Sequence, residues 1–198
     1  SYYKILFTSG IALMFIPVLL HGMLRDGINA WVPTMITETY TVSPSFSVFV
    51  SVVLPVINLS GAYIAMFIYG RFSKGNEITT GLISLIIGII PTFVLVFMGK
   101  INLISSVVML ALTTTFITSF NHMTVTMMPL RFAKYNKAAT LTGTLNSITY
   151  AGCALSNYIF GYSSEHFGWN YTVIIWLCIF ILGALVSALA IKRWGKFI

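Results

Sequence analysis

Two charged residues, Arg25 and Asp26, interrupt an apolar stretch that reads LLHGMLRDGINAWVPT from residue 19. If this stretch crosses a membrane as one helix, a cation at mid-depth costs about 2.5–3.5 kcal/mol. Such a cost indicates either a structural ion pair or a site for an anion. Asp26 lies about 100° around the helix from Arg25 and is therefore expected to be a poor partner. A planar guanidinium binds phosphate or carboxylate through two parallel hydrogen bonds, which favours an anion site.

Two further polar residues share a helical face with Arg25. His21, Arg25 and Asn29 follow one another at intervals of four residues, so a continuous helix places them on one stripe. A stripe of this kind is expected to face the interior of a helix bundle or an aqueous cavity. His21 and Asn29 are therefore candidate substrate-binding residues beside Arg25, and Asp26 is a candidate for ion pairing or coupling.

A second polar stripe occurs near the end of the chain, on the segment 138–163. It consists of Asn146, Tyr150, Cys153 and Asn157, spaced as on one side of a helix. These groups either line a cavity or form hydrogen bonds between helices. Beside them, small residues recur every four positions, a spacing that is typical of closely packed membrane helices. The small residues are Ala139, Gly143, Ser147 and Ala151.

Asn121 and His122 lie in another apolar segment, where an amide and an imidazole both require partners. They are either satisfied core residues or groups that contact a substrate or a proton. The chain contains only 4 acidic residues, which is too few for paired-carboxylate catalysis or a metal cage. We therefore expect no enzyme activity, no metal and no cofactor.

The composition indicates an all-α membrane protein with the lipid bilayer as its surroundings. Hydrophobic residues make up 58% of the 198 residues and charged residues only 8%, whereas a soluble domain carries about 25% charged residues. A membrane-spanning helix needs about 20 mostly apolar residues. Six segments meet this requirement, and Pro17, Pro55 and Pro91 should kink them rather than end them. The predicted helices are 5–38, 45–70, 78–98, 102–129, 138–163 and 169–191, forming a single bundle.

The basic residues predict the orientation of this bundle, because cytoplasmic loops of membrane proteins are rich in Lys and Arg. Lys100 is expected on the opposite side, near Glu38, Glu165 and His166. The net charge of +7 is thus explained by topology, and nucleic acid is not an expected partner. Both termini should be cytoplasmic, in a multi-pass protein of the inner or plasma membrane. The cations expected on the cytoplasmic side are Lys4, Arg71, Lys74, Arg131, Lys134, Lys137, Lys192, Arg193 and Lys196.

The stretch LRDGINAWVPTMITE resembles the seventh helix of the organophosphate:phosphate antiporters of the major facilitator superfamily. The matching residues are Arg25, Gly27, Ile28, Trp31, Pro33 and Thr34. KAATLTGTLNSITYAG resembles the eleventh helix of that family, and GYSSEHFGW resembles its turn into the twelfth. The resemblance covers essentially the whole chain, as the C-terminal six-helix half of a twelve-helix transporter. One departure is Gly70, which stands before Arg71 where the superfamily carries an acidic residue of a latch.

The resemblance implies that Arg25 contributes to a phosphate site and that Tyr150 lines the same cavity. It also implies an N-terminal six-helix half that supplies a second arginine, and exchange of a small anionic solute for inorganic phosphate. Three alternatives remain open. The protein is a transporter-like sensor of phosphate esters, it transports a carboxylate or neutral solute with Arg25 held by Asp26, or the chain works alone as a homodimer. Because Ser1 is not followed by a signal-peptide pattern, we expect a piece of a longer protein.

Overall fold

The computed structural model describes residues 2–98 and 102–198, and within these residues all regular structure is helical. The α-helices are connected by short turns, and two irregular helical segments follow α6. The elements are α1 (Tyr2–Ser9), α2 (Ile11–Tyr40), α3 (Pro44–Asn58), α4 (Ser60–Arg71), α5 (Glu77–Met98), α6 (Leu103–Asn121), η1 (His122–Met127), η2 (Met128–Tyr135), α7 (Ala138–Phe167) and α8 (Trp169–Phe197).

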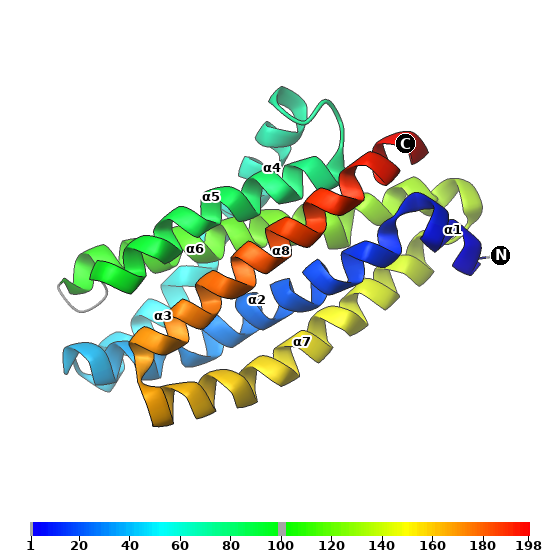
Figure 1. Cartoon of the computed structure of the whole chain (residues 1–198). Coiled ribbons are helices and arrows are strands. Elements are labelled where there is room, and N and C mark those ends of the chain that lie inside the picture. Colours follow the sequence, from blue (N-terminus) through cyan, green and yellow to red (C-terminus); the bar gives the residue numbers. More distant parts are fainter. Residues whose placement is uncertain (1, 99–101) are drawn as a thin grey trace.

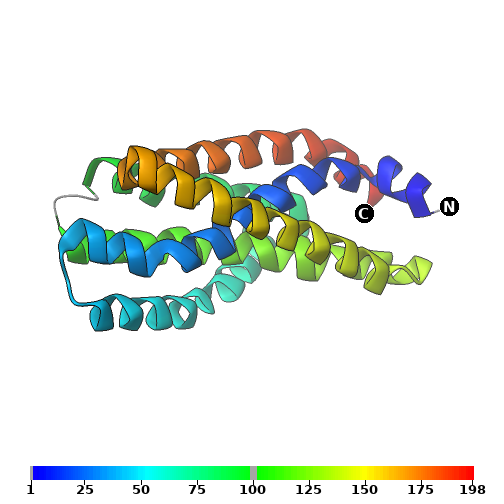
Figure 2. The ribbon, with the colours of Figure 1, turned by 90° about the horizontal axis from the view of Figure 1, so that it is seen from below.

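Helix α2 is central to the bundle and packs mainly against α7 and α8 (Figure 1). Helix α5 packs against both α8 and α6, while α3 and α4 lie against α6 on the other side. In Figure 2, seen from below, α2 and α7 cross closely near their middles. Both termini lie at one end of the bundle, and the α7–α8 turn lies at the other. The two termini thus share one end of the bundle, and Lys100 lies outside the described residues.

The helices follow the order of the six predicted segments, but one of the corresponding helices is not apolar enough to count as a membrane span. Five helical segments are long and apolar enough to cross a membrane. Among the described helices, α7 is not one of this group, although its 30 residues extend about 45 Å at 1.5 Å per residue. The five segments are Ile11–Tyr40, Pro44–Arg71, Glu77–Phe97, Leu103–Tyr135 and Trp169–Phe197.

Helical breaks divide two of the predicted segments. Gly10, with φ of 82°, separates α1 from α2, and the first predicted segment continues from there as the 30-residue helix α2. A break at Leu59 separates α3 from α4. By contrast, Pro17, Pro55 and Pro91 lie inside α2, α3 and α5, so these helices continue through proline as membrane helices often do. The prediction that internal prolines do not end these helices is confirmed.

The chain after α6 leaves regular α-helix but remains helical. A π-helical segment begins at His122, and a 3-10 segment follows from Met128 to Tyr135. Pro129 has no backbone N–H to donate, so the α-helical ladder cannot continue unchanged through this residue. Such π-helical segments frequently mark functional sites.

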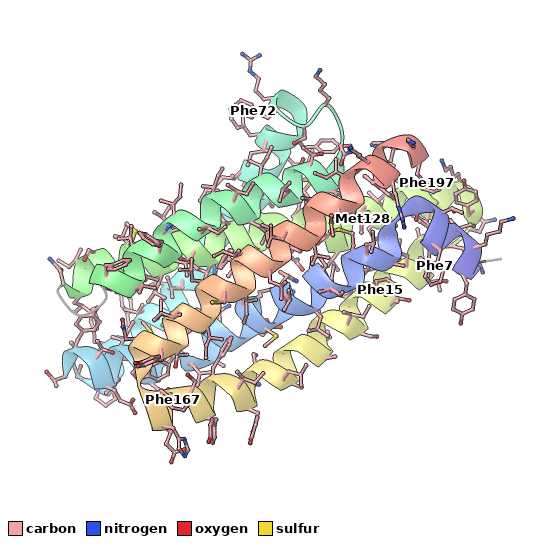
Figure 3. The ribbon with its side chains drawn as sticks, in the orientation of Figure 1. Phe7, Phe15, Phe72, Met128, Phe167 and Phe197 are labelled. Carbon is pink, nitrogen blue, oxygen red and sulfur yellow. The ribbon has the colours of Figure 1, made fainter. Side chains whose placement is uncertain are left out.

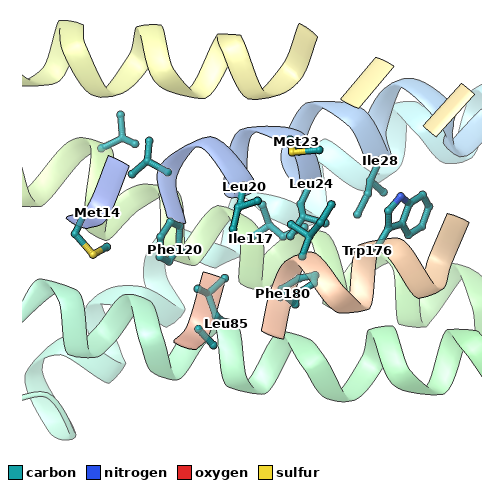
Figure 4. Close-up of a cluster of buried hydrophobic side chains, with 14 of the residues drawn as sticks. Met14, Leu20, Met23, Leu24, Ile28, Leu85, Ile117, Phe120, Trp176 and Phe180 are labelled. Atoms are coloured by element: carbon teal, nitrogen blue, oxygen red, sulfur yellow. The ribbon is translucent and has the colours of Figure 1, made fainter. Parts of the chain in front are cut away.

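Buried apolar side chains from most of the helices form the core of the bundle. Figure 4 shows part of it, where Phe120 of α6 lies near Met14 and Leu20 of α2, and Ile28 of α2 lies near Trp176 of α8; all of these side chains are buried. Burying a side chain of this kind contributes roughly 1.5–3 kcal/mol. The outer surface is also apolar, as expected of helices that face lipid. Figure 3 shows Phe72 and Phe167 projecting away from the bundle, and both are exposed.

Candidate functional site

Arg25 lies at the middle of α2, with 14 helical residues before it and 15 after it in Ile11–Tyr40. Its Nε and Nη2 atoms donate to Oδ1 and Oδ2 of Asp26, both at 2.8 Å. This is a two-bond, charge-assisted ion pair, the strongest kind of pairing available to arginine. The Arg25 and Asp26 side chains are 23% and 27% exposed, so the pair is accessible from one side.

The pairing of Arg25 with Asp26 corrects our expectation that Asp26 would be a poor partner. The angle between adjacent positions on a helix separates the Cβ atoms, but it does not fix the ends of long side chains. The Arg25 side chain bends back toward Asp26 and brings its Nε–H edge against the carboxylate. The ion pair therefore satisfies part of the charge that a buried guanidinium would otherwise leave unpaired.

Asn121 supplies a third contact to the guanidinium from a different helix. Nη1 of Arg25 donates to Oδ1 of Asn121 at 3.2 Å. Asn121 is the last residue of α6, and His122 opens the π-helical segment. The change in helical geometry thus occurs beside the ion pair. The sequence prediction singled out both residues, but the structure brings only Asn121 into contact with Arg25.

Tyr150 of α7 also lies beside the guanidinium, with its ring centroid 6.0 Å from Cζ of Arg25. This separation is at the outer limit of a cation–π contact. The Tyr150 side chain is 64% exposed, so its ring borders the open side of the ion pair. The structure therefore brings together Arg25, Asp26, Asn121 and Tyr150 from three helices.

Close packing of α2 against α7 positions these side chains. A Cβ atom added to Gly22 would lie 2.1 Å from the carbonyl oxygen of Thr149, the residue before Tyr150. A Cβ atom added to Gly152 would lie 2.1 Å from the carbonyl oxygen of Leu19. Only glycine at both positions permits this approach. The two glycines bring the α7 backbone against α2 within one turn of Arg25.

The other residues of the predicted stripe on α2 contribute differently. The Asn29 side-chain amide donates to the backbone carbonyl of Arg25 at 2.7 Å, within its own helix. His21 is buried, and its ring lies 5.4 Å from that of Phe120. Nδ1 of His21 is 3.4 Å from the carbonyl of Val18, and its Nε2 has no hydrogen-bond partner among the described residues. Neither side chain contacts the guanidinium directly.

The polar stripe of α7 is only partly turned toward the site. Asn146 and Cys153 are half-buried on either side of Tyr150, and Asn157 is exposed. The neighbouring small-residue stripe corrects a prediction, because it does not pack against another helix of the described chain. Gly143 has no atom within 4 Å of an added Cβ, and the helix instead packs on α2 through Leu145 and Gly152. The complete small stripe is exposed: Ala139, Gly143, Ser147 and Ala151.

A groove of about 480 Å³ opens between α2 and α7, toward the end of the bundle that carries the α7–α8 turn. Glu38 and Glu165 line it together with the rings of Trp31, Tyr158 and Tyr162. Glu38 also accepts a hydrogen bond from Nε1 of Trp169 at 2.7 Å. Its two carboxylates make this groove unsuitable for an anion, and Arg25 is not part of its lining.

A second polar cluster, formed around Glu77, was missed by the sequence predictions. Glu77 is buried at the first turn of α5, and its Oε1 accepts a hydrogen bond from Nε of Arg131 at 2.7 Å. Tyr69 donates to the same oxygen at 3.2 Å, and Trp194 donates to Oε2 at 2.9 Å. Arg131 also donates to the Tyr69 hydroxyl and to the carbonyl of Gly75. The cluster joins α4, α5, η2 and α8 at the end of the bundle that carries the termini.

The only sequence signal for this cluster was a single acidic residue among many cations. We predicted Arg131 only as a determinant of orientation, together with Arg71, which is exposed. A comparison with known protein families gives no match for this sequence, and no curated protein matches it significantly.

Proposed function

We propose that the chain is one half of a secondary transporter that moves an organic anion, most specifically a phosphate ester, by alternating access. The observation that carries this proposal is the position of Arg25. It is midway along an apolar helix, it is held by Asp26 and Asn121, and its surroundings remain open beside Tyr150. A cation that is kept at this depth at a cost of a few kcal/mol is typical of a substrate pathway.

The guanidinium retains donors for such a ligand. Arginine carries five N–H groups, and three of them are used by Asp26 and Asn121. Five minus three leaves two N–H groups, one on Nη1 and one on Nη2. Each of them can donate to an oxygen of a phosphate or carboxylate. An anion can therefore bind Arg25 end-on while the side of the guanidinium remains supported.

The resemblance to the organophosphate:phosphate antiporters supports a phosphate ester as the substrate and inorganic phosphate as the exchanged ion. The exposed small-residue stripe of α7 supports a second six-helix half, because this pattern packs closely against another helix and here is uncovered. In this proposal the two halves rock against one another around a site at Arg25. The six helical segments each cross the inner or plasma membrane, with both termini in the cytoplasm.

The Arg25–Asp26 pair also supports a second candidate, a transporter of neutral solutes in which Arg25 is purely structural. A sensor that binds phosphate esters without moving them is a third candidate from a different class. Competition in uptake assays between phosphate esters, carboxylates and neutral sugars separates the first two. Binding without flux in reconstituted vesicles identifies the sensor.

The decisive experiment measures uptake of a labelled phosphate ester by the full-length protein in proteoliposomes preloaded with inorganic phosphate. Arg25→Lys keeps the charge but loses the planar fork, and should reduce uptake by about tenfold or more, a loss of roughly 1.4 kcal/mol or more. Arg71→Ala removes an exposed arginine and is the matched control, with uptake expected to be unchanged. Normal uptake by the Arg25→Lys and Arg25→Ala variants would refute the role of Arg25 as an anion site.

A further inference from the structure

An aliphatic groove runs along the outer face of the bundle where α5 packs against α8 (Figure 1). Its volume is about 290 Å³, and every side chain in its lining is aliphatic. Ala184 and Ala188 have the shortest of these side chains, while the others are Leu and Ile. The lining includes Leu82, Ile86 and Ile89 of α5 and Ile181, Leu185 and Ala188 of α8.

The groove belongs to the apolar outer surface and extends over the depth of one membrane leaflet. Ile86, Ile181 and Leu185 of its lining are exposed, and so is the neighbouring Leu189. Ile181 and Lys192 are eleven positions apart, which corresponds to about 16 Å along the helix at 1.5 Å per residue. Half of a hydrocarbon core of about 30 Å is about 15 Å. With Lys192 at the headgroups, the groove therefore reaches about the middle of the bilayer.

Two lysines lie where the groove approaches the end of the bundle that carries the termini. Lys192 follows Ala188 by four positions and Leu185 by seven, so it lies on the face of α8 that lines the groove. Lys196 lies one turn further along the helix, and both lysines are exposed. An anionic group at the mouth of the groove therefore meets two cations on one helix.

The charge at this end of the bundle is almost wholly positive. The chain has only 4 acidic residues, and Glu77 is the one that lies at this end, where it is buried and paired with Arg131. Among the described residues, neither Lys192 nor Lys196 forms an ion pair with an acidic side chain. The two lysines thus remain available to an anion from outside the chain.

We propose that this groove binds an anionic phospholipid, with one acyl chain between α5 and α8 and the phosphodiester at Lys192 and Lys196. The acyl chain is already in hydrocarbon before it binds, so its contribution is the sum of many weak dispersion contacts that depend on a close fit. The lysines supply the selectivity, because basic side chains at the headgroup level attract anionic lipids. The inference does not depend on whether Arg25 binds an anion.

A lipid chain fits this groove better than a further helix does. The groove volume of about 290 Å³ is spread over about 10 Å of α8, from Ile181 to Ala188. It is therefore much narrower than a helix, which is about 10–12 Å across with its side chains. Exposed large side chains such as Ile86 and Leu185 border it, whereas the exposed small-residue stripe that suits a neighbouring helix lies on α7.

The acyl-chain site is tested with the full-length protein in nanodiscs of phosphatidylcholine that contain a minor fraction of phosphatidylglycerol with a photoreactive acyl chain. Illumination and peptide mass spectrometry should place the cross-links in residues 82–89 and 181–188. Ala188→Phe fills the groove and should remove most of these cross-links. Leu189→Phe adds the same ring at an exposed position outside the lining and should retain them. Cross-links spread evenly over the apolar face, or equal losses in the two variants, would overturn the proposal.

The headgroup site is tested by native mass spectrometry, which counts the phosphatidylglycerol and phosphatidylcholine that the protein retains from an equal mixture. The double variant Lys192→Gln, Lys196→Gln should lower the preference for phosphatidylglycerol roughly 25-fold, at about fivefold for each basic residue near the surface. Lys137→Gln removes an exposed lysine from the start of α7, which packs mainly on α2, and is the matched control. Equal retention of both lipids by the wild-type protein, or an unchanged preference in the double variant, would refute the headgroup site.

A second copy of the chain is the other occupant that the test must distinguish. In a protein whose Cys153 and Cys178 have been replaced by serine, Ala188→Cys places a thiol in the groove. Under oxidising conditions in membranes, this variant should remain without disulfide-linked dimers. Efficient dimer formation would place α8 of another copy over the groove and would overturn the lipid site.

Discussion

Nε1 of Trp194, near the end of α8, donates a hydrogen bond to Oε2 of Glu77 at the start of α5, across 117 positions of sequence. The other oxygen of Glu77 holds Arg131 and Tyr69. One buried carboxylate at the start of α5 thus joins that helix to α4, η2 and α8. The contact closes the end of the bundle at which both termini lie.

Replacing this carboxylate should loosen that end of the bundle. Glu77→Gln leaves an amide that can accept fewer hydrogen bonds and cannot pair with the charge of Arg131. We expect a loss of about 2 kcal/mol in the free energy of unfolding, and a lower melting temperature of the purified protein in detergent. Glu165→Gln is the same change at an exposed residue and should leave the melting temperature unchanged. Equal melting temperatures for the two variants would contradict a stabilising role for Glu77.

Gly152 should tolerate no side chain, because an added Cβ would lie 2.1 Å from the Leu19 carbonyl oxygen. Gly152→Ala must push α7 away from α2, at a cost of about 1–3 kcal/mol. We expect a lower melting temperature and weaker phosphate-ester binding, since Tyr150 moves with the α7 backbone. Gly70→Ala is the control, because nothing lies within 4 Å of a Cβ added at Gly70. A Gly152→Ala protein as stable as the Gly70→Ala protein would show that the helices can separate freely.

Asn121 should increase the affinity of Arg25 for an anion by holding the guanidinium in place, without contacting the anion itself. Asn121→Ala removes the acceptor of the Arg25 Nη1 bond, a hydrogen bond to a charged group worth about 1.5 kcal/mol or more. We expect the Kd for a phosphate ester to rise roughly tenfold, as measured by calorimetry. Asn146→Ala changes a half-buried amide that does not bond Arg25 among the described residues, and should leave Kd nearly unchanged. A larger rise in Kd for Asn146→Ala than for Asn121→Ala would contradict this assignment and would place the anion nearer to Asn146 on α7.

The orientation of the bundle can be measured directly with single cysteines. In a protein whose Cys153 and Cys178 have been replaced by serine, Glu165→Cys and Lys74→Cys each place a thiol at an exposed position. A membrane-impermeant maleimide applied to intact cells should label Glu165→Cys. Lys74→Cys should react only after permeabilisation, because basic loops remain in the cytoplasm. The reverse labelling pattern would invert the proposed topology.

The order of the helices could be predicted from the sequence, because long apolar segments separated by polar turns have few alternatives. The breaks at Gly10 and Leu59 and the π-helical segment at His122 could not. The break at Gly10 depends on a long-range contact, because Gly10 lies against Arg193 of α8. The extent of α7 and α8 was also underestimated, since their polar ends continue as helix to Phe167 and Phe197.

The candidate site was predicted in part. Charge within an apolar helix correctly drew attention to Arg25, Asp26 and Asn121, which the structure brings into contact. The sequence could not give the direction of a side chain, so Asp26 was wrongly expected to be a poor partner. It also could not show that Gly152, rather than Gly143, faces α2. The role of Glu77 was hidden because two of its partners, Arg131 and Trp194, lie 54 and 117 positions away in the sequence.

Helix α7 raises a question of biogenesis, since it is the least lipid-compatible of the long helices and is held against α2 by paired glycines. Such a segment gains less from hydrocarbon than the other long helices do. Its insertion should therefore be helped by α2, which is synthesised earlier and packs against it. The same contact that sets Tyr150 beside Arg25 would then also govern whether newly made chains insert fully or are sent for degradation.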